Sequence, residues 1–235
     1  MNPKVSIITV VYNGVQFLER AIQSVLKQTY ANIEYIIVDG GSTDGSQDII
    51  KKYDSKIKKW VSEKDGGIFE AMNKGILMAR GDLIGILNAD DWYENDAVEK
   101  IVAAYTSSPE GDIFHGLLCF REQNEDIQYI SGHTSNYFSK GIEHPTCFIK
   151  REIYQKCGAF DSKFRSAGDY ELLLRFKKLG LDFVFVDKVI ANFRSGGQST
   201  SLKGAIETIN LNYKYGFISP LKRLVLIAYW RLKSI

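Results

Sequence analysis

Three short polar segments of the sequence follow runs of apolar residues and carry side chains suited to ligand binding. Tyr12 and Asn13 follow the first run, Asp39 and Gly40 follow the second, and residues 88–91 follow a later one. A tyrosine ring offers a flat face on which a base can stack, and a carboxylate accepts hydrogen bonds from a base or a ribose hydroxyl. Turn formation is the alternative, because Asn, Asp and Gly favour turns. The recurrence of the pattern after three apolar runs favours binding.

The third segment could hold a metal ion. Asn88, Asp90 and Asp91 place two or three oxygen donors on one turn, which suits a hard divalent cation such as Mg²⁺ or Mn²⁺. Such a cation would bridge a diphosphate and neutralise the charge that builds on it as it leaves. No G-x-G-x-x-G follows the first apolar run, and no G-x-x-x-x-G-K-[ST] occurs in the sequence. We therefore expect a metal, and not a glycine loop, to hold the phosphates.

The spacing of apolar residues in the first half predicts the elements that position these segments. Continuous apolar runs predict buried strands, and apolar residues at helical spacing predict the helices between them. The predicted strands are residues 5–11, 34–39, 60–61 and 83–87, and the clearest helices are 17–26 and 68–78. This alternation predicts an α/β fold with a mostly parallel central sheet flanked by helices. Ligands of such sheets bind beyond the carboxyl ends of the strands, where the polar segments lie.

The second half of the sequence is less regular. Its predicted elements are a hairpin at 113–120 and 126–130, a strand at 144–149, a helix at 169–179 and a strand at 182–187. No repeat and no Pro/Gly/Ser-rich linker interrupts the chain. We therefore predict one domain over residues 1–205, with a nucleotide-binding half (1–105) and an acceptor and catalytic half (106–205), followed by a helical tail (206–235).

Composition excludes several classes of protein. The net charge of +2 over 235 residues argues against a dedicated nucleic-acid binder, which would carry a basic excess. The three cysteines show no C-x-x-C spacing, so neither a zinc knuckle nor a disulfide framework is expected. The sequence has neither a signal-peptide core nor an apolar run of about 18 residues. We therefore expect a cytoplasmic protein.

Five segments, in order, resemble the signature of the family 2 glycosyltransferases. They are residues 5–13 (VSIITVVYN), 38–46 (VDGGSTDGS), 65–75 (DGGIFEAMNKG), 79–82 (ARGD) and 87–91 (LNADD). The resemblance covers about the first hundred residues. It implies a GT-A fold, an inverting reaction, a nucleoside-diphosphate sugar donor with UDP as the expected nucleotide, and Mn²⁺ or Mg²⁺ as cofactor. An enzyme of the type that builds bacterial surface polysaccharides would take a saccharide or lipid-linked saccharide as acceptor.

The resemblance assigns residues to the base side of the donor pocket. Tyr12 and Asp39 match residues that contact the donor base, and their neighbours Asn13 and Gly40 are expected in the same pocket. Asp65, which opens the third segment, matches another contact on the base side.

The resemblance also assigns further residues of the donor pocket. Asn73 and Lys74 match the helix that closes the donor pocket, and Asp90 and Asp91 match the acidic motif that holds ribose and metal. Asn88 stands where the commoner D-x-D motif has its first acid. Asp90, together with Asp91, is therefore the expected anionic metal ligand, and Asn88 the expected donor contact.

Residues 168–171 (GDYE) are similar to the catalytic-base motif of the family. The reaction needs a carboxylate that takes the proton from the acceptor hydroxyl as this hydroxyl attacks the anomeric carbon. We predict that Asp169 is this base. The alternative is a structural acid at the N-cap or in the first turn of a helix.

Two further residues are candidates for the active site. His144 stands where related enzymes often place a histidine near the active site, so a metal or acceptor role is predicted. Many GT-A enzymes have a metal-binding histidine after the base, but no histidine follows Asp169, and phosphates and water would complete the coordination.

Residues 193–199 resemble a mobile segment that closes over the diphosphate or the acceptor, and Arg194 in it could contact phosphate oxygens. The alternative is a plain surface loop.

The tail from residue 217 to 235 mixes apolar and aromatic residues with Lys and Arg and contains no acid. An amphipathic basic helix of this kind suits the surface of an anionic membrane, which would place the protein at the inner face of the plasma membrane. Docking of the helix on the domain or on a second subunit is the alternative.

Two other functions compete with glycosyl transfer. A sugar nucleotidyltransferase would need a glycine-rich loop with Lys or Arg after the first strand, which residues 12–14 do not provide. A non-catalytic nucleotide-sugar binding module would have no need of the base, so the presence of Asp169 argues against it.

Overall fold

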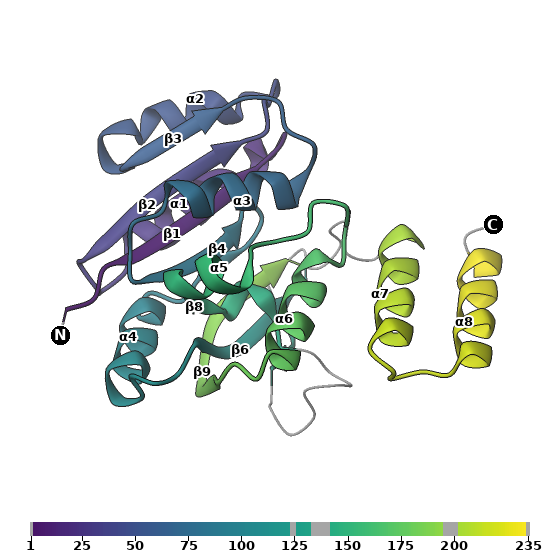
Figure 1. The fold of residues 1–235 in the computed structure, drawn as a ribbon. Helices are drawn as coiled ribbons and strands as arrows, with labels where there is room; N and C mark the ends of the chain where they lie inside the picture. Colours follow the sequence, from purple (N-terminus) through teal and green to yellow (C-terminus); the bar gives the residue numbers. More distant parts are fainter. Residues whose placement is uncertain (1, 123–125, 133–141, 195–201, 234–235) are drawn as a thin grey trace.

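The computed structural model of the chain describes residues 2–122, 126–132, 142–194 and 202–233 (Figure 1). Four strands of the first half pair in parallel in the order β3–β2–β1–β4. Their bounds are β1 (Val5–Val11), β2 (Ile33–Asp39), β3 (Lys59–Ser62) and β4 (Leu83–Asn88). Every residue of β1 is buried, which explains why five of its seven residues are apolar.

The sheet continues beyond β4 in the order β8–β6–β9–β5, and β7 pairs with β6. The bounds are β5 (Trp92–Tyr93), β6 (Ile113–Arg121), β7 (Ile127–Ser131), β8 (Phe148–Lys150) and β9 (Phe183–Arg194). Strands β5, β7 and β8 run antiparallel to their neighbours, whereas β6 and β9 are parallel to each other. Six of the nine strands therefore share one direction, as the prediction of a mostly parallel sheet requires.

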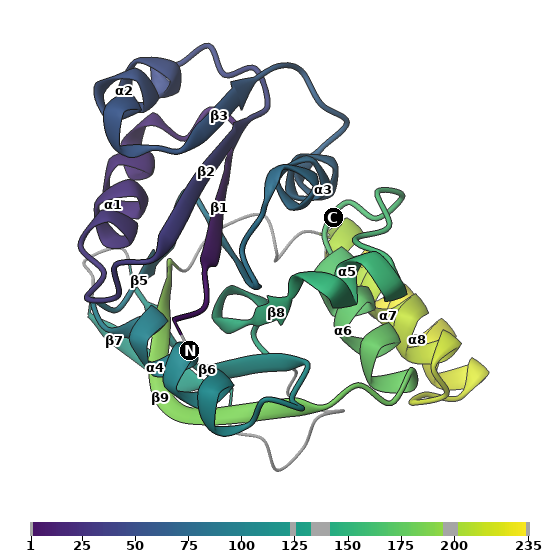
Figure 2. The ribbon, with the colours of Figure 1, turned by 60° about the vertical axis from the view of Figure 1, so that its left-hand side comes forward.

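Helices cover both faces of the sheet (Figure 2). On one face pack α1 (Val15–Leu26), α2 (Ser46–Lys52) and α4 (Ala97–Ser107). On the other face pack α3 (Ile68–Met78), α5 (Arg151–Cys157) and α6 (Gly168–Lys178). Neighbouring residues of β1 alternate between the two cores, with Ile7 in the first and Ile8 in the second. The predicted α/β fold with helices on both faces is confirmed.

The strand predicted at residues 144–149 is wrong over its first half. His144–Thr146 form a short 3₁₀ helix, η3, and strand β8 begins only at Phe148. Pro145 has no N–H to give to a neighbouring strand. The turn is instead held by Thr146, whose N–H and hydroxyl both donate to the carbonyl oxygen of Glu143 at 2.9 and 2.8 Å.

The segment predicted to be mobile at residues 193–199 begins inside a strand. Phe193 and Arg194 belong to β9, where they pair in parallel with Phe120 and Arg121 of β6. The rest of that predicted segment lies outside the described residues. Strand β5 was not predicted, because two residues are too few to produce a periodic pattern.

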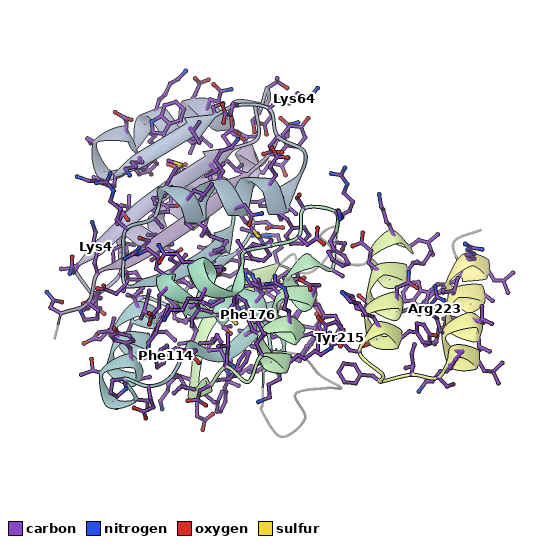
Figure 3. All side chains as sticks on the ribbon, viewed as in Figure 1. Lys4, Lys64, Phe114, Phe176, Tyr215 and Arg223 are labelled. Carbon is purple, nitrogen blue, oxygen red and sulfur yellow. The ribbon has the colours of Figure 1, made fainter. Side chains whose placement is uncertain are left out.

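The last two helices, α7 (Leu202–Lys214) and α8 (Pro220–Lys233), lie side by side at the edge of the molecule, with α8 outermost (Figure 1). Arg223 of α8 lies between the two helices (Figure 3), donates a 2.8 Å hydrogen bond to Asn210 and stacks over Tyr213. Since α7 crosses residue 205, the division of the chain at 205/206 stays a prediction. Among the described residues, no helix combines the length and apolar composition needed to cross a bilayer.

Candidate active site

The carboxyl ends of β1, β2 and β4 meet at one edge of the sheet because these strands pair in register. Val11 pairs with Asp39 of β2, and Val10 pairs with Asn88 of β4. The N–H of Gly40 donates to the carbonyl oxygen of Val11 over 2.9 Å, which ties the first two strand ends together. The three polar segments predicted to bind ligand therefore lie side by side.

An exposed aromatic ring and a carboxylate meet at Gly40. A Cβ atom on Gly40 would lie 2.9 Å from Oδ2 of Asp65 and 3.3 Å from Cδ2 of Tyr12, so glycine is what leaves room for both. The Tyr12 side chain is 70% exposed. Asp65 is half-buried, and its Oδ1 accepts a 2.9 Å hydrogen bond from the N–H of Gly67. A flat exposed ring beside a carboxylate can stack against a base and accept a hydrogen bond from its edge.

Asp39 and Asn13 lie behind this surface and shape the turn that follows β2. Asp39 is fully buried, and its carboxylate accepts hydrogen bonds of 2.5 Å from the hydroxyls of Ser42 and Ser62. Asn13 accepts a 3.0 Å hydrogen bond from the N–H of Thr43 through its Oδ1. A direct contact of either side chain with a ligand stays a prediction.

Asn73 and Lys74 make contacts within the protein. The amide of Asn73 donates to the carbonyl oxygen of Phe160 at 2.8 Å and accepts from the N–H of Phe160 at 2.9 Å. Lys74 forms a 2.7 Å ion pair with Glu63. Asn73 thus fastens α3 to a segment 87 residues later in the chain. A donor contact from Asn73 or Lys74 stays a prediction.

The acidic segment after β4 is partly buried. Asp91 is 1% exposed, and its carboxylate accepts 3.3 Å hydrogen bonds from the Asn88 amide and from the backbone N–H of Arg194. Burial raises the pKa of Asp91 well above its usual value, and the charge of Asp90 raises it further. Burial also raises the pKa of Asp90. Two adjacent carboxylates held in this way favour a nearby positive charge.

These residues fit a divalent cation. Oδ1 of Asn88 is a buried oxygen for which the described part of the chain provides no hydrogen-bond donor, and buried acceptors are rarely left without a partner. A cation beside it would also relieve the repulsion between Asp90 and Asp91. Over the described ranges, no three His, Cys, Asp or Glu side chains gather closely enough to hold a metal by themselves. Diphosphate oxygens and water would therefore supply the remaining ligands.

His144 is not gathered with Asp90 and Asp91 into such a group. Its buried ring packs edge-on against Phe160, with 5.4 Å between the ring centroids. Burial lowers the pKa of His144 to about 4, so the imidazole is neutral at pH 7. A metal or acceptor role for His144 stays a prediction.

Arginine and aromatic side chains gather next to the acidic segment. Arg194 ends β9, and its guanidinium carbon lies 4.7 Å from the ring centre of Phe17 and 5.7 Å from that of Trp92. The guanidinium of Arg20 stacks on Trp92 at 3.4 Å. Cationic groups beside an acidic metal segment are suited to a diphosphate. No motif in the sequence predicts Arg20 as a site residue. Trp92 could have been predicted, because it directly follows the acidic motif.

Asp169 lies half-buried in the first turn of α6. It does not cap the helix: the N-cap residue is Ala167, and Oδ1 of Asp169 accepts a 2.7 Å hydrogen bond from the adjacent N–H of Tyr170. Burial raises the pKa of Asp169 to about 6, and the charge of Glu207 also raises it. A carboxyl group with this pKa is deprotonated at neutral pH and is a stronger base than an ordinary aspartate.

Comparison with known proteins decides the family. The model of "Glycosyl transferase family 2" matches residues 6–165, which is more than half of the chain. The chain belongs to this family. An uncharacterized glycosyltransferase of Mycobacterium tuberculosis is 32% identical, over 74% of this chain and 68% of that protein. The chondroitin synthase of Pasteurella multocida is 28% identical over 86% of this chain, which spans only 22% of the synthase.

Solved glycosyltransferases share the fold of this family 2 chain. Staphylococcus aureus TarS in complex with UDP-GlcNAc matches with a TM-score of 0.73 at 16% identity, covering 97% of this chain and 71% of that chain. The mannosyltransferase PcManGT of Pyrobaculum calidifontis, in complex with GDP-Man and Mn²⁺, matches with a TM-score of 0.73 at 18% identity, covering 98% and 70%. The chain is thus a glycosyltransferase with a GT-A fold. The resemblance to family 2 glycosyltransferases, found in the sequence, is confirmed.

Asn73→Ala should lower the free energy of unfolding by about 1–3 kcal/mol, because the N–H and carbonyl of Phe160 both lose their partner. Urea unfolding would measure the change, with substitution of the exposed Asn95 by Ala as the matched control. Equal stability of Asn73→Ala and Asn95→Ala would contradict the fastening role of Asn73.

Proposed function

We propose that this glycosyltransferase moves a sugar from a nucleoside-diphosphate sugar to a saccharide or lipid-linked saccharide hydroxyl, with inversion at the anomeric carbon. The proposal rests on Asp169, a half-buried carboxylate whose pKa is raised to about 6. The strand ends of the same fold present an exposed Tyr12 and an acidic segment. A general base should have a pKa near the working pH and still be deprotonated there.

In the proposed reaction, the carboxylate of Asp169 accepts the proton of the acceptor hydroxyl. The oxygen forms a bond to the anomeric carbon while the bond from that carbon to the diphosphate oxygen breaks. A single displacement of this kind inverts the configuration. A Mn²⁺ or Mg²⁺ ion held by Asp90 and Asp91, with Asn88, would neutralise the charge of the departing diphosphate. Arg194 would add a second positive charge beside it.

We assign the donor base to the surface formed by Tyr12, Gly40 and Asp65, where the ring would stack and the carboxylate would accept a hydrogen bond. UDP is the proposed nucleotide. The solved relatives support a nucleotide-sugar donor in general, since TarS was solved with UDP-GlcNAc and PcManGT with GDP-Man. The nucleotide sugars in these two structures carry different bases, so a binding measurement with each nucleotide must test the choice of UDP.

The outer face of α8 is proposed to bind an anionic membrane, which suits a lipid-linked acceptor. Five apolar residues at helical spacing lie on this face, each more than half exposed: Leu221, Leu224, Val225, Tyr229 and Leu232. At 100° per residue, Lys222 and Lys233 flank this stripe on one side and Arg231 on the other. Basic side chains beside an apolar stripe match the headgroups and acyl boundary of an anionic bilayer.

A second copy of the chain fits this face less well. No Asp or Glu occurs from residue 208 to 235, so packing two α8 stripes together would bring Lys and Arg against Lys and Arg. Like charges facing one another oppose association. We therefore propose that this face binds an anionic lipid surface, at the inner face of the plasma membrane.

A thermal-shift panel tests the donor site. UDP, GDP, CDP, dTDP and their sugars are added with and without Mn²⁺, and a ligand that binds the folded state must raise the melting temperature. We expect a Mn²⁺-dependent rise with UDP and UDP-sugars that Asp90→Ala abolishes. Asp48→Ala, which removes an exposed acid on α2, should keep the rise. No rise with any nucleotide, in folded protein, would refute the donor site.

Asp169→Asn should lower kcat at least about a hundredfold, because the amide cannot accept the proton. Donor affinity in the thermal-shift assay should stay unchanged.

The wild-type kcat/KM should fall about tenfold per pH unit below pH 6, as Asp169 with its pKa near 6 becomes protonated. Asp187→Asn, at an exposed position of β9, is the control. Normal turnover of Asp169→Asn would exclude Asp169 as the base, and absence of turnover from both wild type and variant would favour a binding module.

Sedimentation with lipid vesicles tests the α8 surface. We expect the protein to bind vesicles that contain phosphatidylglycerol but not vesicles of phosphatidylcholine alone, and to release at high salt because screening weakens the charge attraction. Leu224→Glu/Leu232→Glu should weaken binding at least about tenfold. Leu77→Glu is the control, since Leu77 is 87% exposed on α3. A dimer that the α8 substitutions disrupt, without vesicle binding, would overturn the membrane proposal.

A further inference from the structure

The turn that precedes Asp169 is held by one carboxylate from a distant helix. Oε2 of Glu207, on α7, accepts hydrogen bonds from the backbone N–H groups of Ser166 and Ala167 at 2.9 Å each and of Arg165 at 3.2 Å. Its Oε1 accepts from the N–H of Arg165 at 2.9 Å. Three successive N–H groups that converge on one anion form a nest, an arrangement that binds negative charge well.

Glu207 holds the turn that leads into α6. Ala167 is the N-cap residue of α6, and its side chain has no oxygen that could accept a hydrogen bond from the first turn. The carboxylate of Glu207 satisfies N–H groups at and before this position and adds a negative charge at the positive end of the helix. A second bond, from the hydroxyl of Tyr170 to Asn212 at 2.8 Å, joins the same two helices.

The same turn also contacts the donor half of the molecule. The guanidinium of Arg165 donates a hydrogen bond to the carbonyl oxygen of Gly66, the residue after Asp65. One residue before the base, a Cβ atom on Gly168 would lie 2.7 Å from the ring of Phe69 in α3. The turn is therefore fixed against the donor half on one side and against α7 on the other.

We propose that Glu207 is a positioning residue that sets the place of the catalytic base: by holding residues 165–167 it fixes where α6 begins and where Asp169 faces the acceptor. This inference rests on the proposed role of Asp169 as base. Misplacing a reacting group by about 1 Å can cost about a hundredfold in rate, so the contribution of Glu207 should appear in kcat.

Glu207 also acts on Asp169 through its charge. After burial, the charge of Glu207 raises the pKa of Asp169. Among the residues that the structure describes, Glu143, before η3, and Cys147 also interact electrostatically with Asp169, and a substitution of Glu207 changes neither of them. Removal of the Glu207 charge should therefore lower the pKa of Asp169 and move the acid limb of the pH profile to lower pH.

The test compares Glu207→Gln and Glu207→Ala with wild type in kcat, in donor KM and in the pH dependence of kcat/KM. We expect kcat to fall about 10- to 100-fold in Glu207→Ala and less in Glu207→Gln, which keeps one acceptor oxygen. Donor KM should change less than about threefold, and the acid limb should shift to lower pH in both variants. Glu152→Gln, which removes an exposed charge on α5, should leave kcat and the acid limb unchanged.

Wild-type kcat and an unshifted acid limb in Glu207→Gln would overturn the inference, as would a rise in donor KM with unchanged kcat. If Glu207→Ala fails to fold, the acid limb of Glu207→Gln decides, because a purely structural contact would not move it. Asp169→Asn separates the two proposals. Full turnover of that variant refutes the base and the inference together, whereas loss of turnover with normal Glu207 variants refutes the inference alone.

Discussion

The in-register parallel pairing of β1 with β2 on one side and with β4 on the other is the constraint on which the active site depends. Side chains of a strand alternate between its two faces, so a shift by one residue would exchange them. Here that exchange would turn the residues that pack under α1 and α2 towards α3, and it would break the alignment of Asp39 with Val11 and of Asn88 with Val10. Since both faces of these strands are buried, packing of the two cores fixes the geometry of the sheet edge that carries Tyr12, Gly40 and Asn88.

Buried carboxylates among the described residues differ in whether their neighbours offset the effect of burial on the pKa. In Glu34, burial would raise the pKa, but hydrogen bonds from Ser6 and Arg80 and the charges of Lys4 and Lys59 lower it. This acid is satisfied by its neighbours and has a structural role. Asp90, Asp91, Asp169 and Glu143 have pKa values raised by burial, so a nearby cation or a bound proton would stabilise them. Acids with raised pKa values are candidates for functional sites. Asp90, Asp91 and Asp169 also lie at positions that the family resemblance assigns, whereas Glu143 does not.

The sequence was sufficient where a local pattern determines the structure. Continuous apolar strands in the first half are of this kind, and so is the acidic motif after β4. It was insufficient where distant residues decide the outcome. Asn73 and Phe160 are 87 residues apart, and Glu207 lies 40 residues beyond Ala167, and no periodicity encodes such pairs. The strand predicted at 144–149 is wrong over its first half because Pro145, within an otherwise apolar run, cannot donate a hydrogen bond to a neighbouring strand. The matched family segment ends at residue 165, so α6 and its supports follow it in the less regular half.

Among the residues that the structure describes, Asn13 is the one non-glycine residue with a positive φ, 50°. Asn tolerates this left-handed backbone better than most residues. Its N–H donates to the Ser42 hydroxyl at 2.7 Å, and its side chain accepts from Thr43. The backbone that follows Tyr12 is therefore held in one conformation by the turn after β2. A base that stacks on this ring would not have to order that backbone, and would lose less binding free energy than at a mobile loop.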